Sequence, residues 1–171
     1  MKALLVIDML KDFIEEDGAL YCGQTARRII PFVKQKIDEF RRTEDLVIYI
    51  CDSHEENDLE FRMFTRHSVK GTRGAEIIDE LPVEESDIFI RKSRFSAFYN
   101  TNLDQILDEK KVTEVHVVGV CTSICVMDTV GDLRNRDNEV IVYAQGVADF
   151  DPVAHEYSMK RMEKTYGAQI L

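Results

Sequence analysis

The chain has 171 residues, of which 44% are hydrophobic and 32% are charged, and its formal net charge is −10. This size and composition are typical of one globular domain, expected here to span residues 1–171. The acidic balance disfavours nucleic acid and anionic membranes as partners. No apolar run approaches the roughly 20 residues that cross a bilayer. Without a signal peptide or a lipidation motif, the sequence predicts a cytoplasmic protein.

Segments rich in β-branched residues alternate with amphipathic segments along the whole chain. The pattern predicts strands at residues 3–8, 46–51, 87–90, 115–120, 139–143 and 168–171. Apolar residues recur at helical spacing after Thr25, after Thr101 and after Ser123, and Pro152 suits the first turn of a further helix. This alternation predicts an α/β fold with a mostly parallel sheet covered by helices on both faces, in an order that spacing does not give.

Reactive side chains follow four of the predicted strands. In chain order they are Asp8, Asp52, His54, Lys92 and Cys125. Ligands of open parallel sheets bind beyond the carboxyl ends of the strands, so these residues are candidates for a common site.

Cys125 is the candidate nucleophile. It stands where a helix is expected to begin, and the positive end of a helix lowers the pKa of a thiol. Outward-facing backbone N–H groups of the same turn suit an oxyanion. The alternative is a small buried apolar residue. Cys121 and Cys125 are spaced C-x-x-x-C, which differs from the C-x-x-C of redox motifs, and all four cysteines are expected to be free thiols.

Asp8 and Lys92 are candidate partners of this thiol. Asp8 directly follows an apolar run, where a carboxylate is costly to bury unless it is paired. It could be a general base or a simple turn cap. Lys92 lies between Arg91 and Arg94, so it is either surface charge or the cation that pairs with Asp8.

Asp52, His54, His67 and Glu60 form a candidate metal site. Side chains two residues apart at the end of a strand point the same way, so Asp52 and His54 could act together. His67 could supply a third ligand and Glu60 a fourth. Nitrogen and oxygen ligands suit zinc, iron(II) or manganese. The other two histidines, in a predicted strand and a predicted helical segment, fit structural roles.

Four phenylalanines lie close in sequence to these residues: Phe13, Phe64, Phe95 and Phe98. They could wall a pocket for a flat ring, or belong to the ordinary core.

Four motifs, taken in order, resemble the isochorismatase-like cysteine hydrolases, and among them the nicotinamidases. They are VIDMLKDF, DSHEENDLEFRMFTRH with GTRGAE behind it, KSRFSAF and GVCTSICV. The resemblance implies a three-layer α/β/α sandwich and a catalytic triad of Asp8, Lys92 and Cys125. It also implies a cis peptide bond between Val120 and Cys121, which aims the N–H groups of Cys121 and Cys125 at an oxyanion.

The resemblance also implies a cofactor and a substrate. Its metal ligands correspond to Asp52, His54 and His67, with Glu60 as a further ligand, and zinc is the expected ion. Phe13 and Phe64 correspond to residues that sandwich a pyridine ring, and Phe95 is expected beside them. Relatives commonly form dimers or tetramers, so a homo-oligomer is expected.

These features predict hydrolysis of nicotinamide, or a close analogue, through a Cys125 thioester. Thr65 and Arg66 stand where nicotinamidases commonly have prolines, Ser123 replaces an acidic residue and Cys121 a small one. These departures leave the identity of the amide substrate open. One rival is a metal-independent cysteine amidohydrolase for another small amide or carbamoyl compound. The other is a non-catalytic binding domain on the same fold.

Overall fold

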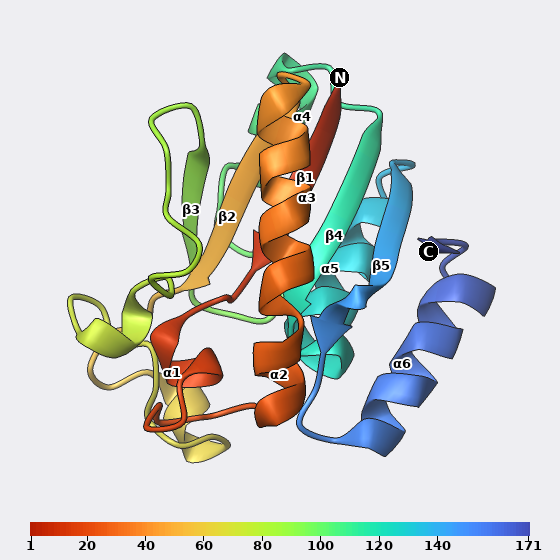
Figure 1. Cartoon of the computed structure of the whole chain (residues 1–171). Coiled ribbons are helices and arrows are strands. Elements are labelled where there is room, and N and C mark those ends of the chain that lie inside the picture. The colour runs from red at the N-terminus through yellow and green to blue at the C-terminus, as the bar shows by residue number, and fades with distance from the viewer.

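A central sheet lies between two layers of helices in the computed structural model, which describes residues 1–171 (Figure 1). All strand pairs are parallel, and the strand order is β3-β2-β1-β4-β5-β6. The strands are β1 (Lys2–Ile7), β2 (Leu46–Asp52), β3 (Ile88–Lys92), β4 (Glu114–Val120), β5 (Glu139–Ala148) and β6 (Gln169–Ile170). The predicted α/β fold is confirmed, and the sheet is parallel throughout.

The helices divide between the two faces of the sheet. They are α1 (Lys11–Ile14), α2 (Gln24–Arg28), α3 (Ile30–Arg42), α4 (Leu103–Glu109), α5 (Met127–Arg134) and α6 (Pro152–Lys164). In β1, Leu4 and Val6 join one core with α1 to α3, whereas Leu5 and Ile7 join a second core with α4 to α6. Successive side chains of a strand point to opposite faces, so an entirely apolar strand supplies both cores. The three-layer architecture is confirmed.

The apolar stripe after Thr25 forms two helices instead of one. α2 ends before Ile29 and α3 begins at Ile30, with Pro31 in its first turn. A proline has no N–H to donate and its ring clashes with the carbonyl four residues earlier, here that of Arg27. The proline therefore breaks the helix although the apolar spacing continues through it.

β5 runs further than predicted, to Ala148. The polar and small residues after Tyr143 interrupt the apolar pattern, and the pairing with β4 shifts there: Val117 pairs with Val142, but Gly119 pairs with Val147. A bulge of this kind bends a strand and increases its twist. Asp149, directly after the strand, is thereby brought to the carboxyl edge of the sheet.

The carboxyl end of β4 packs tightly against that of β1. Gly119 has φ +121°, and a Cβ there would lie 2.0 Å from the carbonyl oxygen of Ile7. Only glycine allows this approach. The approach brings the turn after β4 beside Asp8, the residue that follows β1.

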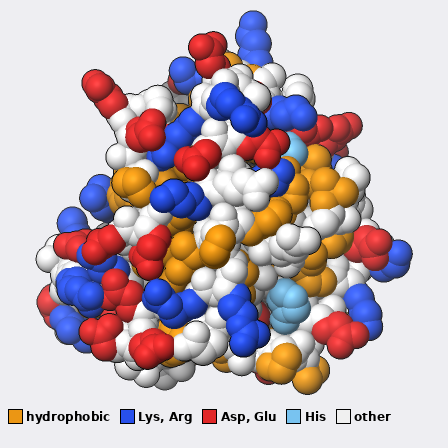
Figure 2. Space-filling model, in the orientation of Figure 1, with side chains coloured by type: hydrophobic (Ala, Val, Ile, Leu, Met, Phe, Trp, Pro, Cys, Tyr) orange, Lys and Arg blue, Asp and Glu red, His pale blue; other side chains and the backbone are white.

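None of the helices combines the length and apolar content of a membrane span. The face of the molecule in Figure 2 carries acidic and basic side chains intermixed, with no continuous basic surface.

Candidate active site

Lys92 is the centre of a buried cluster at the carboxyl edge of the sheet. Its Nζ lies 2.8 Å from Asp8 Oδ2 and donates to Cys125 Sγ at 3.5 Å. It also forms an ion pair with Asp52. Lys92 is the last residue of β3, which is separated from β1 by β2. Only 2% of Lys92 is exposed. The structure therefore brings the three predicted triad residues together, and Lys92 is not surface charge.

The charges of this cluster perturb one another. Burial and the neighbouring charge of Asp52 raise the pKa of Asp8 to about 6, against the opposing effect of Lys92. Burial disfavours ionised Asp52 too, but the ammonium of Lys92 and the two histidines hold its pKa below the usual range. Burial likewise lowers the pKa of Lys92, yet its two carboxylate partners outweigh burial and keep it well above the ordinary value. The site thus holds one cation between two carboxyl groups that differ in basicity.

Cys125 lies in a wide turn, Thr122–Val126, that leads directly into α5. Burial raises the pKa of its thiol well above the usual value; Lys92 opposes this, and Asp8 adds to it. The expectation that a helix start lowers this pKa is wrong here, because burial and two carboxylates outweigh the helix end. The sulfur is therefore a thiol at neutral pH, and the Asp8 carboxyl group lies within 4.8 Å of it.

The same turn carries backbone donors. The Val120–Cys121 peptide bond is cis, as the resemblance implies. The Cys121 carbonyl accepts from the N–H of Ile124 at 3.1 Å and of Val126 at 3.2 Å, whereas its own N–H donates to no protein acceptor. This free donor beside Cys125 can receive an oxyanion.

Asp149 holds this turn, and sequence reasoning missed it. Its Oδ2 accepts from the N–H of Ser123 at 2.7 Å, and its Oδ1 accepts from Asp151 at 3.0 Å. Asp149 is only 5% exposed. It follows a strand end, so the rule that identified Asp8 would have found it had β5 been predicted at its full length.

Asp52, His54, Glu60 and His67 gather beside the triad, and their ligand atoms all lie within 4.8 Å of one another. Asp52 Oδ2 is 3.6 Å from His54 Nε2 and 3.8 Å from His67 Nε2. Glu60 Oε1 is 3.9 Å and 3.8 Å from the same two nitrogens. These spacings slightly exceed the roughly 3.4 Å between two ligands of a tetrahedral zinc ion.

The outer nitrogens of both histidines face oxygen atoms, and that of His67 is hydrogen-bonded. His54 Nδ1 lies 3.2 Å from Asp58 Oδ2, and His67 Nδ1 lies 2.7 Å from the carbonyl oxygen of Thr65. Such contacts orient metal-binding imidazoles with the inner nitrogen toward the ion. Both ring nitrogens of His54 and Glu60 Oε2 are buried and have no hydrogen-bond partner. The donor set therefore fits a divalent cation.

Two residues around this cluster change the sequence-based interpretation. The sequence analysis did not identify Asp58, whose carboxylate faces His54. The Asp58 carboxylate also accepts from the N–H of Glu60 at 2.9 Å and from Arg94 at 2.9 Å. Its position within DSHEEND, beside the proposed ligands, was the available signal. Thr65 departs from the nicotinamidase pattern in its side chain, but it contacts His67 through its backbone, which does not depend on the side chain.

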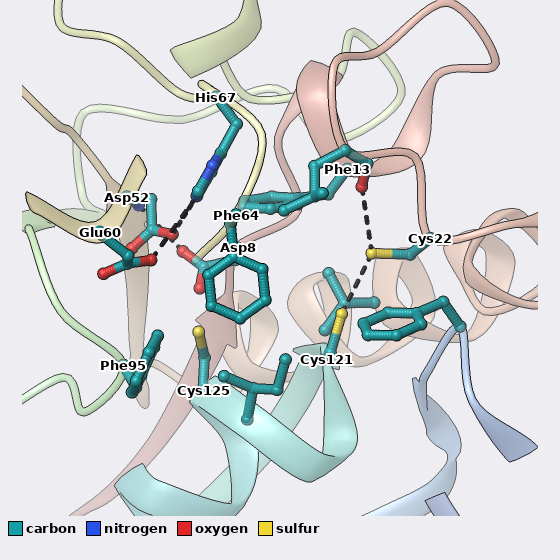
Figure 3. A pocket seen from close by; sticks show the side chains of 14 residues that line it. Asp8, Phe13, Cys22, Asp52, Glu60, Phe64, His67, Phe95, Cys121 and Cys125 are labelled. Atoms are coloured by element: carbon teal, nitrogen blue, oxygen red, sulfur yellow. Dashed lines mark hydrogen bonds and ion pairs between the residues drawn. The ribbon is translucent and has the colours of Figure 1, made fainter. Parts of the chain in front are cut away.

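An apolar pocket opens above the triad, with an empty volume of about 390 Å³ including its mouth. Phe13, Phe64 and Phe95 line it, whereas Phe98 does not and instead packs under Arg136. In the view of Figure 3, the ring of Phe64 lies between the Asp8 side chain and the paired sulfur atoms of Cys22 and Cys121, and Phe95 lies near Cys125. The ring of Phe13 lies 5.3 Å from that of His67. Further apolar walls, which sequence reasoning missed, come from Leu20, Val120, Ile124 and Phe150.

Three solved structures of relatives are closely similar to this chain. A nicotinamidase from Bacillus subtilis is 34% identical, with a TM-score of 0.94 over 99% of this chain and 98% of the other. An N-carbamoylsarcosine amidase from Thermoplasma acidophilum is 35% identical, with a TM-score of 0.91 over 99% and 94%. A pyrazinamidase from Pyrococcus horikoshii in complex with zinc is 32% identical, with a TM-score of 0.93 over 99% and 98%.

The model of the isochorismatase domain matches residues 2–171, which is nearly the whole chain. These three relatives are named as amidases, and this chain has a buried thiol, a buried carboxyl group and an apolar pocket at one edge of its sheet. The chain belongs to the isochorismatase family.

Proposed function

We propose that this protein hydrolyses nicotinamide, or a closely similar aromatic amide, to the acid and ammonia. The observation that carries the proposal is the position of Lys92 Nζ, which contacts both the Asp8 carboxylate and the Cys125 sulfur at the base of an apolar pocket. A base, a nucleophile and a fixed positive charge then meet where a substrate carbonyl would lie.

In the first half-reaction Asp8 takes the thiol proton while the sulfur of Cys125 attacks the amide carbon. The carbonyl oxygen becomes negative, and the N–H groups of Cys121 and Cys125 receive it, with Lys92 adding positive charge. Asp8 then returns the proton to the amide nitrogen. The C–N bond breaks, ammonia leaves, and a thioester to Cys125 remains.

The second half-reaction uses the same groups. Asp8 removes a proton from water, and the resulting hydroxide attacks the thioester carbon. The C–S bond breaks, the sulfur of Cys125 regains a proton, and the acid is released. Because burial raises the pKa of Asp8 to about 6, we expect kcat/KM to fall as the pH drops below that value.

Asp52, His54, His67 and Glu60 would hold a divalent cation, with zinc preferred and iron or manganese as alternatives. When bound, the metal would supply a Lewis-acid contact that orients the ring nitrogen of the substrate. Phe13 and Phe64 would sandwich the ring, and Phe95 would close the pocket beside Cys125. The zinc bound by the Pyrococcus relative supports this assignment.

Two alternative functions are distinguished from this proposal by the experiment below. The likeness to an N-carbamoylsarcosine amidase supports a carbamoyl substrate, hydrolysed by the same triad without a metal. A binding domain without catalysis is the other. A homo-oligomeric state, a cytoplasmic location and a single domain stay predictions; light scattering of the purified protein tests the first.

The deciding experiment measures ammonia release from nicotinamide and from N-carbamoylsarcosine, with added zinc and with a chelator. We expect turnover of nicotinamide that the chelator abolishes. Cys125→Ala should remove it, whereas Cys51→Ala, which deletes a buried thiol outside the pocket, should retain it. Turnover of only the carbamoyl compound, unaffected by the chelator, would favour the first rival. If no small amide is hydrolysed and Cys125 reacts no faster than a free cysteine, the enzyme assignment fails.

A further inference from the structure

Two cysteines outside the triad lie in contact at the wall of the pocket. The sulfur atoms of Cys22 and Cys121 are 3.1 Å apart, although the residues are 99 positions apart in the chain. They are 1% and 7% exposed, respectively. Figure 3 shows the two sulfurs facing each other, to one side of Cys125. The proposed mechanism uses neither thiol group.

Each cysteine is held by its backbone. Cys22 lies between α1 and α2, where its N–H donates to the carbonyl of Phe13 at 2.8 Å and its sulfur contacts the carbonyl of Leu20 at 3.6 Å. Cys121 begins the turn that carries Cys125. The backbone therefore fixes the position of each sulfur, and the contact between them does not depend on one mobile side chain.

The surroundings favour sulfur chemistry over metal binding. Both residues line the pocket, and Cys121 is the more exposed of the two, so a small reagent that enters the pocket meets Cys121 first. Neither belongs to the two groups of residues whose ligand atoms cluster closely enough to hold a metal. The hydrogen bond with Cys22 and burial raise the pKa of Cys121 well above its ordinary value. Thiolates are the reactive form, so oxidation at this site should be slow.

We infer that Cys22 and Cys121 form an oxidation site at which a small hydroperoxide converts the thiol pair to a disulfide. The first sulfur attacks a peroxide oxygen; the O–O bond breaks, water or an alcohol leaves, and a sulfenic acid remains. The second sulfur attacks the first, the S–O bond breaks and water leaves. Two thiols are oxidised and one hydroperoxide is reduced. From 3.1 Å, the sulfurs approach by roughly 1 Å to reach disulfide length.

The disulfide would lower activity, and this part rests on the proposed function. The approach of the sulfurs pulls on the residue whose N–H is assigned to the oxyanion, and it draws the loop of Cys22 against the pocket. A displacement of about 1 Å in a catalytic site can cost up to about 100-fold in rate. We expect at least about a 10-fold loss, restored by dithiothreitol.

The first experiment does not depend on activity. Full-length Cys125→Ala protein, which lacks the proposed nucleophile, is treated with hydrogen peroxide, blocked with a thiol reagent and mapped by mass spectrometry without reduction. We expect a peptide containing Cys22 linked to a peptide containing Cys121. Adding Cys22→Ala should abolish the link, and adding Cys51→Ala should preserve it. A link between other cysteines, or no link while the protein remains folded by circular dichroism, would overturn the oxidation site.

The second experiment compares wild-type protein with Cys22→Ala and Cys51→Ala. Each is assayed before oxidation, after it and after dithiothreitol, and only ratios within one variant are compared. Wild type and Cys51→Ala should lose and regain activity in step with the linked peptide. Equal reversible loss in Cys22→Ala would assign the effect to oxidation of Cys125 and overturn the inhibitory role. If the amidase assignment fails, the peptide map alone decides whether the disulfide forms.

Discussion

Replacing Asp8 with asparagine should abolish turnover and yet stabilise the fold. Asparagine has nearly the shape of a protonated carboxyl group, but it cannot ionise or accept a proton from Cys125. In the native protein the Asp8 carboxyl group is 1% exposed, and burial together with Asp52 raises its pKa to about 6. Lys92 keeps its other partner, Asp52, in the variant. The substitution therefore removes a disfavoured charge without leaving the ammonium unpaired.

The size of the effect follows from the raised pKa. A carboxyl group whose pKa rises on folding contributes stability that is fully present below the unfolded pKa and is lost as the pH rises through the folded value. From an ordinary value of 3.8 to about 6, at about 1.36 kcal/mol per unit, ionised Asp8 costs about 3 kcal/mol near pH 8. Near pH 5 the cost falls to between about 1 and 2 kcal/mol. Asp8→Asn should be more stable by these amounts.

Urea denaturation of both proteins near pH 5 and near pH 8, in the presence of a chelator, measures the difference. Asp38→Asn, which neutralises an exposed carboxylate on α3, serves as the control and should change little at either pH. Asp52 is common to both proteins, so its own contribution largely cancels. The reasoning is refuted if Asp8→Asn is less stable than the native protein near pH 8, because Lys92 would then favour the ionised form more than burial opposes it.

The remaining predictions concern the groups around Asp8. Lys92→Met should abolish turnover and destabilise the chelated protein by about 3–5 kcal/mol in urea denaturation, because it leaves buried carboxylates without their cation; a loss below about 1 kcal/mol would contradict this. Asp58→Asn should weaken zinc binding by about 10–100-fold in calorimetric titration, because His54 loses its orienting carboxylate, and unchanged affinity would argue against that contact. Asp149→Ala should lower kcat more than it raises KM, because the Ser123 N–H loses its acceptor and the turn loosens; a change confined to KM would place its effect on binding instead.

Much of the fold followed from local patterns. Apolar runs such as ALLVI predicted strands buried on both faces, and the structure places Leu4 and Leu5 in opposite cores. The errors occurred where a single residue or an irregular strand pairing overrides a pattern. Pro31 divides an apolar stripe that continues through it, and the irregular pairing after Val117 carries β5 past a polar interruption. Hydrophobic periodicity is an average over many residues of a segment. It therefore does not reveal a single missing N–H or a shift in strand pairing.

The candidate residues could also be named from the sequence, because each follows a strand or belongs to a motif. Asp8, Lys92 and Cys125 stood at separate strand ends, and only the strand order β3-β2-β1-β4 brings their atoms together. The thiol pair of Cys22 and Cys121 had no such signal. Its contact depends on a loop meeting a turn across the pocket.

The sequence by itself determined the kinds of group present at one edge of a parallel sheet, because strand period and motif order are local properties. Tertiary structure alone decided their state. Burial raises the pKa of Asp8, which makes it a weaker acid than an exposed aspartate. Burial also keeps Cys125 a thiol, against the expectation from the position of Cys125 at a helix start. The physical reason is that a pKa depends on solvent exclusion and on every nearby charge, and the neighbours of Cys125 come from strands far apart in the chain.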